Sequence, residues 1–230
     1  MEGLVEALAT WHAEGKELVL VSSGAIATGA PYLNLSDRAQ DLATQQAAAA
    51  VGQNLLMVRY QKLLDRFSMT SAQVLLTVGD VENDTHRTNA LRTIDRLLGL
   101  RILPIVNEND TVATQEIRFG DNDRLAALVA EFISADALVL LSDVDSLFTH
   151  PPGDPRAIAI ETVPFNDPLD GVELGPAMVN SVGTGGAVTK VSAARVAAAA
   201  GIPTLLTSTA SLKDVVTGAA TGTWFEADVK

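Results

Sequence analysis

Five short apolar segments recur along the chain, and small or acidic polar residues follow each of them. Longer stretches rich in Ala, Leu and Arg, with apolar residues at helical spacing, lie between these segments. Short apolar runs of this kind are typical of strands that are buried on both faces. The alternation of strand and helix therefore predicts an α/β fold with a mainly parallel open sheet and helices on both of its faces.

The positions of the expected elements follow from the same patterns. We expect strands in residues 17–25, 72–80, 101–110, 137–145 and 202–210. We expect helices in residues 3–14, 38–67, 84–98, 122–133 and 188–200. Residues 149–157, with the sequence THPPGDPRA, are expected to form a loop because prolines exclude regular structure.

Length and composition limit the class of protein. The 230 residues are enough for one large α/β domain, and we expect a single domain over residues 1–230. With 47% apolar and 19% charged residues, extensive disorder is not expected, and the apolar runs are too short for a membrane span. A net charge of −12 argues against nucleic acid as a partner. The absence of cysteine excludes thiolate metal sites, and with no basic-then-apolar leader we expect a cytoplasmic protein.

Two polar clusters follow the third expected strand, and ligands of such sheets bind beyond the carboxyl ends of the strands. Residues 107–110 (NEND) and 120–123 (GDND) mix carboxylates with carboxamides, which suits the ammonium and carboxylate of an amino acid. A strand-ending turn and a helix N-cap explain the clusters equally well, so both interpretations stay open. A calcium loop is excluded because Leu125 and Ala127 stand where oxygen ligands are required. The intervening residues 113–119 are expected to form a small hairpin lid.

Three further segments are candidates for ligand binding. Residues 21–30, VSSGAIATGA, let backbone N–H groups approach an anion, or simply make a tight strand-to-helix turn. Residues 181–190, SVGTGGAVTK, place glycines and Lys190 at the start of an Ala-rich helix, although neither a Walker A loop nor a GxGxxG spacing is present. The alternative is a glycine-rich helix entry with a solvated lysine. Ser142, Asp143 and Asp145 end a strand and suit a ribose, a base or hydrated Mg²⁺, or else a polar turn.

Taken together, five segments resemble, in the same order, the bacterial glutamate 5-kinases of the amino acid kinase family. They are VSSGAIATG, LLTVGDVENDTHRTNALRTIDRLL, PIVNENDTVATQEIRFGDNDRLAALVA, LLSDVDSLF and GTGGAVTK. The resemblance implies a three-layer α/β/α sandwich and an ATP-dependent phosphorylation of the γ-carboxylate of L-glutamate. The product would be γ-glutamyl phosphate, at the first step of proline biosynthesis. It also implies MgATP as the nucleotide and a homo-oligomer of two or four subunits.

The resemblance assigns roles to individual residues. Lys190 would neutralise the transferred phosphoryl group, and Asp123 would orient catalytic lysines. The residues implied in glutamate binding are Ser23, Gly24, Asn107, Asp110, Asp121 and Asn122. The residues implied in nucleotide binding are Ser142, Asp143, Thr184, Gly185, Gly186, Ala187, Val188, Thr189 and Lys190. No protein residue is implied as a metal ligand.

The chain departs from the family pattern at both ends. The first strand, with its Lys-x-Gly turn, and the C-terminal RNA-modification-like domain of many relatives are expected to be missing. A non-catalytic glutamate-binding or assembly protein is therefore the alternative function. Acetylglutamate, aspartate, carbamate and uridylate kinases share the glycine turns, but the paired clusters at 107–110 and 120–123 discriminate against them.

Overall fold

The computed structural model describes residues 1–33, 41–112, 122–174, 186–219 and 221–228. The chain divides into two units, Met1–Asn122 with Asn180–Thr184 and Asp123–Val179 with Gly185–Lys230. The described part of the first unit contains a three-stranded sheet, and that of the second contains a four-stranded and a two-stranded sheet. The single domain expected from the sequence stays a prediction.

The sheet of the first unit consists of β1 (Leu20–Val21), β2 (Ser71–Leu76) and β3 (Leu103–Glu108). Their order is β1-β3-β2, and both strand pairs are parallel. All six residues of the central strand β3 are buried. A strand that is covered on both faces reads as a continuous apolar run, which is why the sequence signal for β3 was clear.

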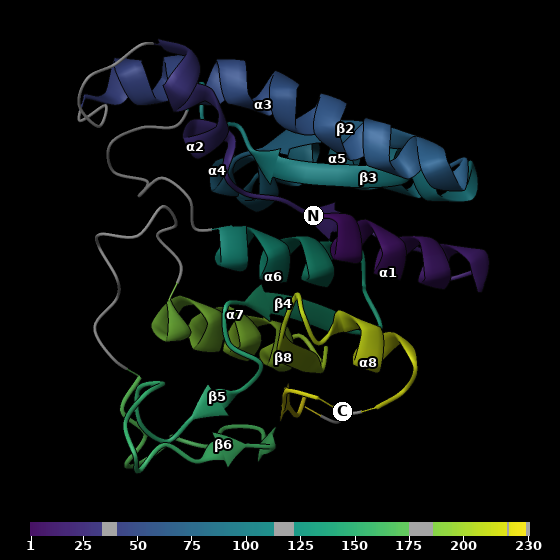
Figure 1. Ribbon diagram of the computed structural model, residues 1–230. Helices are drawn as coiled ribbons and strands as arrows, with labels where there is room; N and C mark the ends of the chain where they lie inside the picture. Colours follow the sequence, from purple (N-terminus) through teal and green to yellow (C-terminus); the bar gives the residue numbers. More distant parts are fainter. Residues whose placement is uncertain (34–40, 113–121, 175–185, 220, 229–230) are drawn as a thin grey trace. The chain divides into compact units, whose positions relative to one another are not determined.

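Helices cover both faces of this sheet (Figure 1). α1 (Glu2–Ala13) and α3 (Leu42–Leu64) form a core with Leu103 and Ile105 of β3. Side chains alternate along a strand, so the fully buried Val106 points to the other face. α5 (Asp84–Gly99), which links β2 to β3, also packs against β3.

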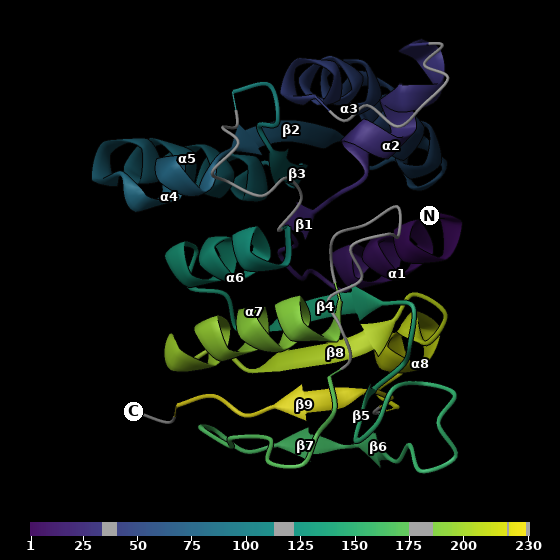
Figure 2. The same ribbon diagram turned by 90° about the vertical axis from the view of Figure 1, so that its left-hand side faces the viewer.

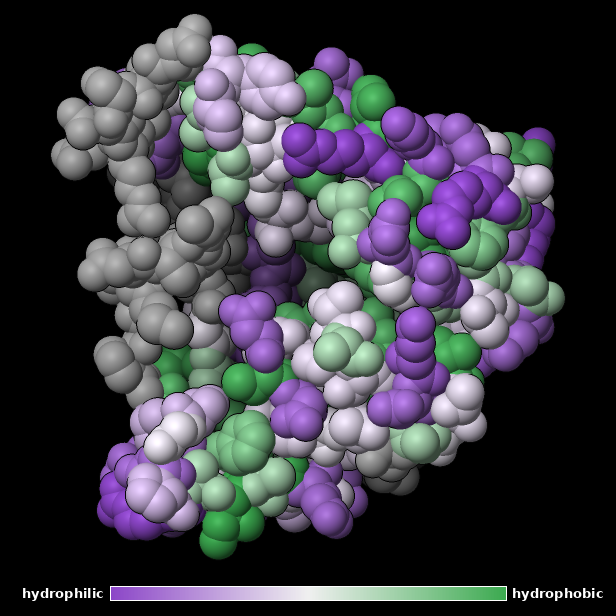
Figure 3. Space-filling model, in the orientation of Figure 1, coloured by the Kyte–Doolittle hydropathy of each residue, from purple (hydrophilic) through white to green (hydrophobic). Residues whose placement is uncertain are grey.

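α3 buries one side along its whole length. Asp41 caps its first turn by accepting a hydrogen bond from the N–H of Thr44. The buried positions recur at helical spacing. The surface in Figure 3 mixes hydrophilic and hydrophobic side chains. The buried residues are Ala48, Ala49, Gly52, Gln53, Leu56, Tyr60 and Leu64. An amide, Gln53, thus stands in an otherwise apolar stripe.

Short helices occupy the turns of the first unit. α2 (Ala25–Gly29) and the 3₁₀ helix η1 (Ala30–Leu33) follow β1, and α4 (Val78–Glu82) follows β2. η2 (Asp65–Phe67) extends α3. A Cβ on Gly52 would lie 1.8 Å from the carbonyl oxygen of Ala25, so α2 and α3 cross with their backbones in contact. This crossing requires glycine.

The four-stranded sheet of the second unit has the order β4-β8-β9-β7. β4 (Leu138–Ser142) and β8 (Thr204–Ser208) are parallel, whereas β9 (Thr223–Phe225) runs antiparallel to β8 and parallel to β7 (Thr162–Val163). Figure 2 shows α7 (Ala187–Ala199) lying along β4 and β8. This unit also contains α8 (Leu212–Val216) and nearly all of α6 (Asn122–Phe132).

Sequence patterns located the long elements well. All five expected strands and all five expected helices are present with narrower or shifted bounds, and four of the six strand pairings described are parallel. The proline-rich residues 149–157 form the expected loop, which connects β5 (Leu147–Phe148) to β6 (Ala159–Ile160). Within the described ranges, no helix combines the length and the apolar character that crossing a membrane requires.

Candidate functional site

Two strand ends of the first unit meet at one edge of its sheet. β1 and β3 are parallel with Val21 opposite Val106, and the N–H of Ser22 continues this pairing by donating to the carbonyl of Val106. Ser23 and Gly24 follow as an exposed turn, in which Gly24 adopts a left-handed φ of 90° as it begins α2. A side chain would strain that conformation, so the turn selects glycine.

This turn is anchored to α3 at two points. The buried Ser22 hydroxyl lies 3.2 Å from the hydroxyl of Tyr60, and burial raises the pKa of Tyr60. The contact between Gly29 and Gly52 holds α2 directly against α3. Ser23 and Gly24 are therefore presented on a rigid support, as a binding turn requires.

Asn107 lies inside the molecule at this edge, with only 1% of its surface exposed. Its Oδ1 accepts a hydrogen bond from the N–H of Glu108 at 2.9 Å, and its Nδ2 donates to Oε1 of Gln53 at 2.7 Å. Gln53 was not among the residues predicted from the sequence. The available signal was a single amide at an otherwise apolar position of α3.

Asp110 follows β3 and is 8% exposed. Burial, and next the negative charge of Glu108, raises the pKa of Asp110 from 3.8 to about 6. These two effects favour a cation beside Asp110, because a bound positive charge offsets both burial and repulsion. The ammonium group of an amino acid meets this need.

In the second unit, Lys190 and Asp123 form an ion pair. Lys190 Nζ lies 2.9 and 3.1 Å from the two carboxylate oxygens of Asp123, and the side chains are only 13% and 16% exposed. The Thr189 hydroxyl lies 2.8 Å from the same carboxylate and accepts a hydrogen bond from the N–H of Gly186. Asp123 thus holds Lys190 in place, and the orienting role that the resemblance implies for this acid stays a prediction.

The start of α7 lies at the carboxyl edge of the second sheet. α7 ends at Ala199 and β8 begins at Thr204, so the helix runs back from the carboxyl edge to the amino edge, as in a βαβ unit. Gly186 and the first turn of α7 are therefore at the same edge as Ser142, the last residue of β4. Ser142 is half-buried and Asp143 is exposed. A helix start with glycine and lysine suits a phosphate.

Some predicted residues lie outside the described part of the chain. They are Asp121, Thr184 and Gly185, and the expected hairpin lid at 113–119. Asn122 is the first residue of α6, and its buried Oδ1 has no hydrogen-bond partner among the described residues. Across those residues, no group of three or more His, Cys, Asp or Glu is arranged to hold a metal ion.

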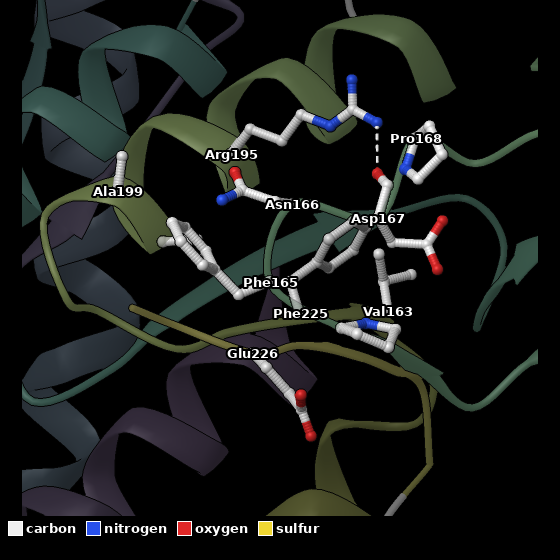
Figure 4. A pocket seen from close by; sticks show the side chains of 11 residues that line it. Val163, Phe165, Asn166, Asp167, Pro168, Arg195, Ala199, Phe225 and Glu226 are labelled. Carbon is white, nitrogen blue, oxygen red and sulfur yellow. Dashed lines mark hydrogen bonds between the residues drawn. The ribbon is translucent and has the colours of Figure 1, made fainter. Parts of the chain in front are cut away.

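A separate pocket lies at the opposite edge of the second sheet (Figure 4). Phe225, in its lining, pairs with Thr204 at the start of β8, and Ala199 comes from the end of α7. Arg195 reaches across and donates a hydrogen bond to the carbonyl oxygen of Asp167 at 2.9 Å. No residue of the predicted site lines this pocket.

Comparisons with known proteins identify the family of the chain. A family model described as the amino acid kinase family matches residues 1–208. A glutamate 5-kinase of Clavibacter michiganensis subsp. michiganensis is 64% identical over 96% of this chain and 85% of its own length. A glutamate 5-kinase of Streptomyces coelicolor is 54% identical over 99% of this chain and 61% of its own length.

A solved structure supports the fold. Carbamate kinase from Giardia lamblia bound to AMP-PNP superposes with a TM-score of 0.67 and 18% identity, over 99% of this chain and 89% of that one. The predicted fold class, an α/β sandwich with a mainly parallel open sheet, is thereby confirmed.

Proposed function

The chain belongs to the amino acid kinase family, and from this premise we propose that it is a glutamate 5-kinase. An oxygen of the γ-carboxylate of L-glutamate attacks the γ-phosphorus of ATP, the bond to the β–γ bridging oxygen breaks, and ADP leaves. The product is γ-glutamyl phosphate. The structural observation that carries the proposal is the ion pair of Lys190 and Asp123 at the start of α7.

Phosphoryl transfer asks the protein for alignment and charge neutralisation rather than for a covalent nucleophile. The acceptor and the nucleotide are both anions, so their approach needs positive groups that are already in place. Lys190, oriented by Asp123, supplies one such charge, and the N–H groups at the start of α7 supply partial charges. Ser142 and Asp143, at the end of β4, are assigned to the nucleoside part of ATP.

We assign Mg²⁺ to the nucleotide rather than to the protein. Mg²⁺ is commonly held by substrate phosphates and water with few protein carboxylates. The ion enters as MgATP and offsets charge on the phosphates.

The acceptor is assigned to the edge of the first sheet. Asp110 offers a carboxylate to the ammonium group of L-glutamate, and the Ser23–Gly24 turn offers a hydroxyl and backbone N–H groups to its carboxylates. Asn122 offers its unpaired Oδ1 to the same ammonium. Asp121 completes the proposed set, and Asn107 lies beside this set at the end of β3.

Substitution of Lys190 tests the proposal. With L-glutamate and MgATP, ADP release by the Lys190→Ala variant should fall on the order of 100 to 1,000-fold, because one preorganised positive charge is lost. The Kd for L-glutamate should change little. Lys213→Ala removes an exposed lysine on α8 and should leave both quantities unchanged.

Equal losses of turnover and of glutamate affinity in Lys190→Ala would contradict the assigned role. ADP release that depends on acetylglutamate, aspartate, carbamate or uridylate instead of L-glutamate would overturn the substrate assignment. Glutamate binding without MgATP binding or turnover would support the non-catalytic alternative.

We further propose a cytoplasmic homo-oligomer of two or four subunits, as the resemblance implies. Light scattering on the purified protein measures the number of subunits, and a monomeric mass would contradict this proposal. Fractionation of the producing cells tests the location, and recovery outside the cytoplasm would contradict it.

A further inference from the structure

We propose that Gln53 contacts the acceptor, with its Nε2 donating a hydrogen bond to a carboxylate oxygen of L-glutamate, and that Asn107 is a positioning residue for Gln53. This inference rests on the proposed function, because it adds a residue to the same acceptor site. It also reverses the expectation that Asn107 itself is the binding amide.

Gln53 occupies an unusual position for an amide. It lies in the apolar stripe of α3, one turn after Ala49 and one turn before Leu56, and it is only 8% exposed. Burying an amide is unfavourable unless its polar atoms are hydrogen-bonded. Packing alone therefore does not explain an amide at this position.

A chain of hydrogen bonds orients the amide. The N–H of Glu108 donates to Oδ1 of Asn107, which leaves Nδ2 of Asn107 to face Gln53. Since Nδ2 is a donor, Gln53 must present Oε1 to it, and Nε2 points elsewhere. The oxygen and the nitrogen of Gln53 cannot exchange places without losing the 2.7 Å bond.

The last group in this series of hydrogen bonds is the donor Nε2 of Gln53. Nε2 of Gln53 is buried and has no hydrogen-bond partner among the described residues. Asn107, by contrast, is 1% exposed and has both amide atoms engaged within the protein. Of the two amides, only Gln53 has a polar atom that makes no hydrogen bond to any described residue.

The surroundings indicate which ligand group Nε2 meets. Gly52, the preceding residue, approaches Ala25, the first residue after the Ser23–Gly24 turn, so Gln53 lies next to the proposed acceptor edge. The carboxylates of Glu108 and Asp110 follow Asn107 on the same strand end and suit the ammonium group. A donor beside them suits the opposite charge, a carboxylate of the acceptor.

Gln53→Glu tests the donor nitrogen of the side chain separately from its acceptor oxygen. The glutamate keeps an oxygen for Asn107 Nδ2 but replaces the donor by an acceptor that repels a carboxylate. By calorimetry, the Kd for L-glutamate should rise on the order of 10 to 100-fold, because a polar group left opposite the wrong partner is strongly unfavourable. The KM for MgATP should stay within about two-fold of the wild-type value.

Asn54→Asp is the matched control, because it adds the same charge at the next residue of α3, where the side chain is exposed. It should leave the Kd for L-glutamate unchanged. A loss equal to that of Gln53→Glu would show a general effect of charge and would overturn the proposal.

Asn107→Asp tests the orientation independently. The aspartate accepts where the asparagine donated, so Gln53 turns its Nε2 inward and its Oε1 toward the acceptor. Glutamate affinity should fall although Gln53 is intact. If Gln53→Glu does not fold by circular dichroism, the uncharged Gln53→Met and Asn107→Asp carry the test.

The outcomes distinguish this inference from the proposed function. Wild-type protein that gives no heat with L-glutamate overturns both. Wild-type binding with an unchanged Kd in folded Gln53→Glu or Gln53→Met overturns only the role of Gln53. Equal losses for L-glutamate and MgATP also overturn it, since they indicate a merely structural role.

Discussion

Asp110 holds its proton to a higher pH than an ordinary carboxyl group, because burial and then Glu108 raise its pKa to about 6. Only the ionised form pairs with an ammonium group, so kcat/KM for L-glutamate should fall as the pH drops below about 6. The bound ammonium lowers the same pKa, so kcat should depend less on pH. Initial rates from about pH 5 to about pH 8 measure both profiles.

Glu108→Gln is the matched variant for this prediction. It removes the charge that is the second cause of the raised pKa, so the acidic limb should move to lower pH. An acidic limb at the same pH in both proteins would assign it to another group.

The raised pKa of Asp110 also makes the free energy of unfolding depend on pH, and this dependence runs opposite to that of kcat/KM. Asp110 stabilises the native state below the unfolded pKa of 3.8, and this contribution is lost as the pH rises through about 6.

At the level of single residues, charged side chains are easier to pick out from the sequence than amides. Lys190 and Asp123 were paired by resemblance, and the structure joins them although they are 67 positions apart. Gln53 was missed because an amide inside an Ala-rich helix resembles any tolerated polar residue. Only the packing of α3 against β3 in the structure shows that Gln53 contacts Asn107.

Among the elements, the crossing of α2 and α3 has a direct consequence for stability. A Cβ on Gly52 would overlap the backbone of Ala25, so Gly52→Ala should lower the free energy of unfolding by about 1–3 kcal/mol or more. A Cβ on Gly99, at the end of α5, would have nothing within 4 Å, so Gly99→Ala should be neutral or slightly stabilising. Urea unfolding compares the two variants, and equal stability would show that the helices separate at no cost.

Short helices and strands are harder to predict from the sequence than long ones. Long strands such as β3 and long helices such as α3 carry a periodic signal over many residues. β7 has two residues, β9 has three, and α2 and α4 have five each, which is too short for a period to appear. Their positions depend on tertiary pairing, for example that of Phe225 with Thr204.

For the molecule as a whole, the proposed acceptor and nucleotide residues fall into different units. Ser23, Gln53 and Asp110 belong to the first, whereas Ser142 and Lys190 belong to the second. L-Glutamate should therefore protect the backbone amides of α3 and β3 from hydrogen exchange, and MgATP should protect those of α7 and β4. Mass spectrometry of exchange with each ligand alone measures this. MgATP that protects β3 more than α7 would contradict the assignment.

Because of that division, the acceptor site and the nucleotide site can change independently during evolution. A lineage that keeps Asp123, Lys190 and the start of α7 retains its means of handling the triphosphate while the other half accumulates change. Substitutions around β3 alone can then change which acceptor is bound. Transplanting the first unit between relatives should carry the choice of acceptor with it and leave the choice of nucleotide behind.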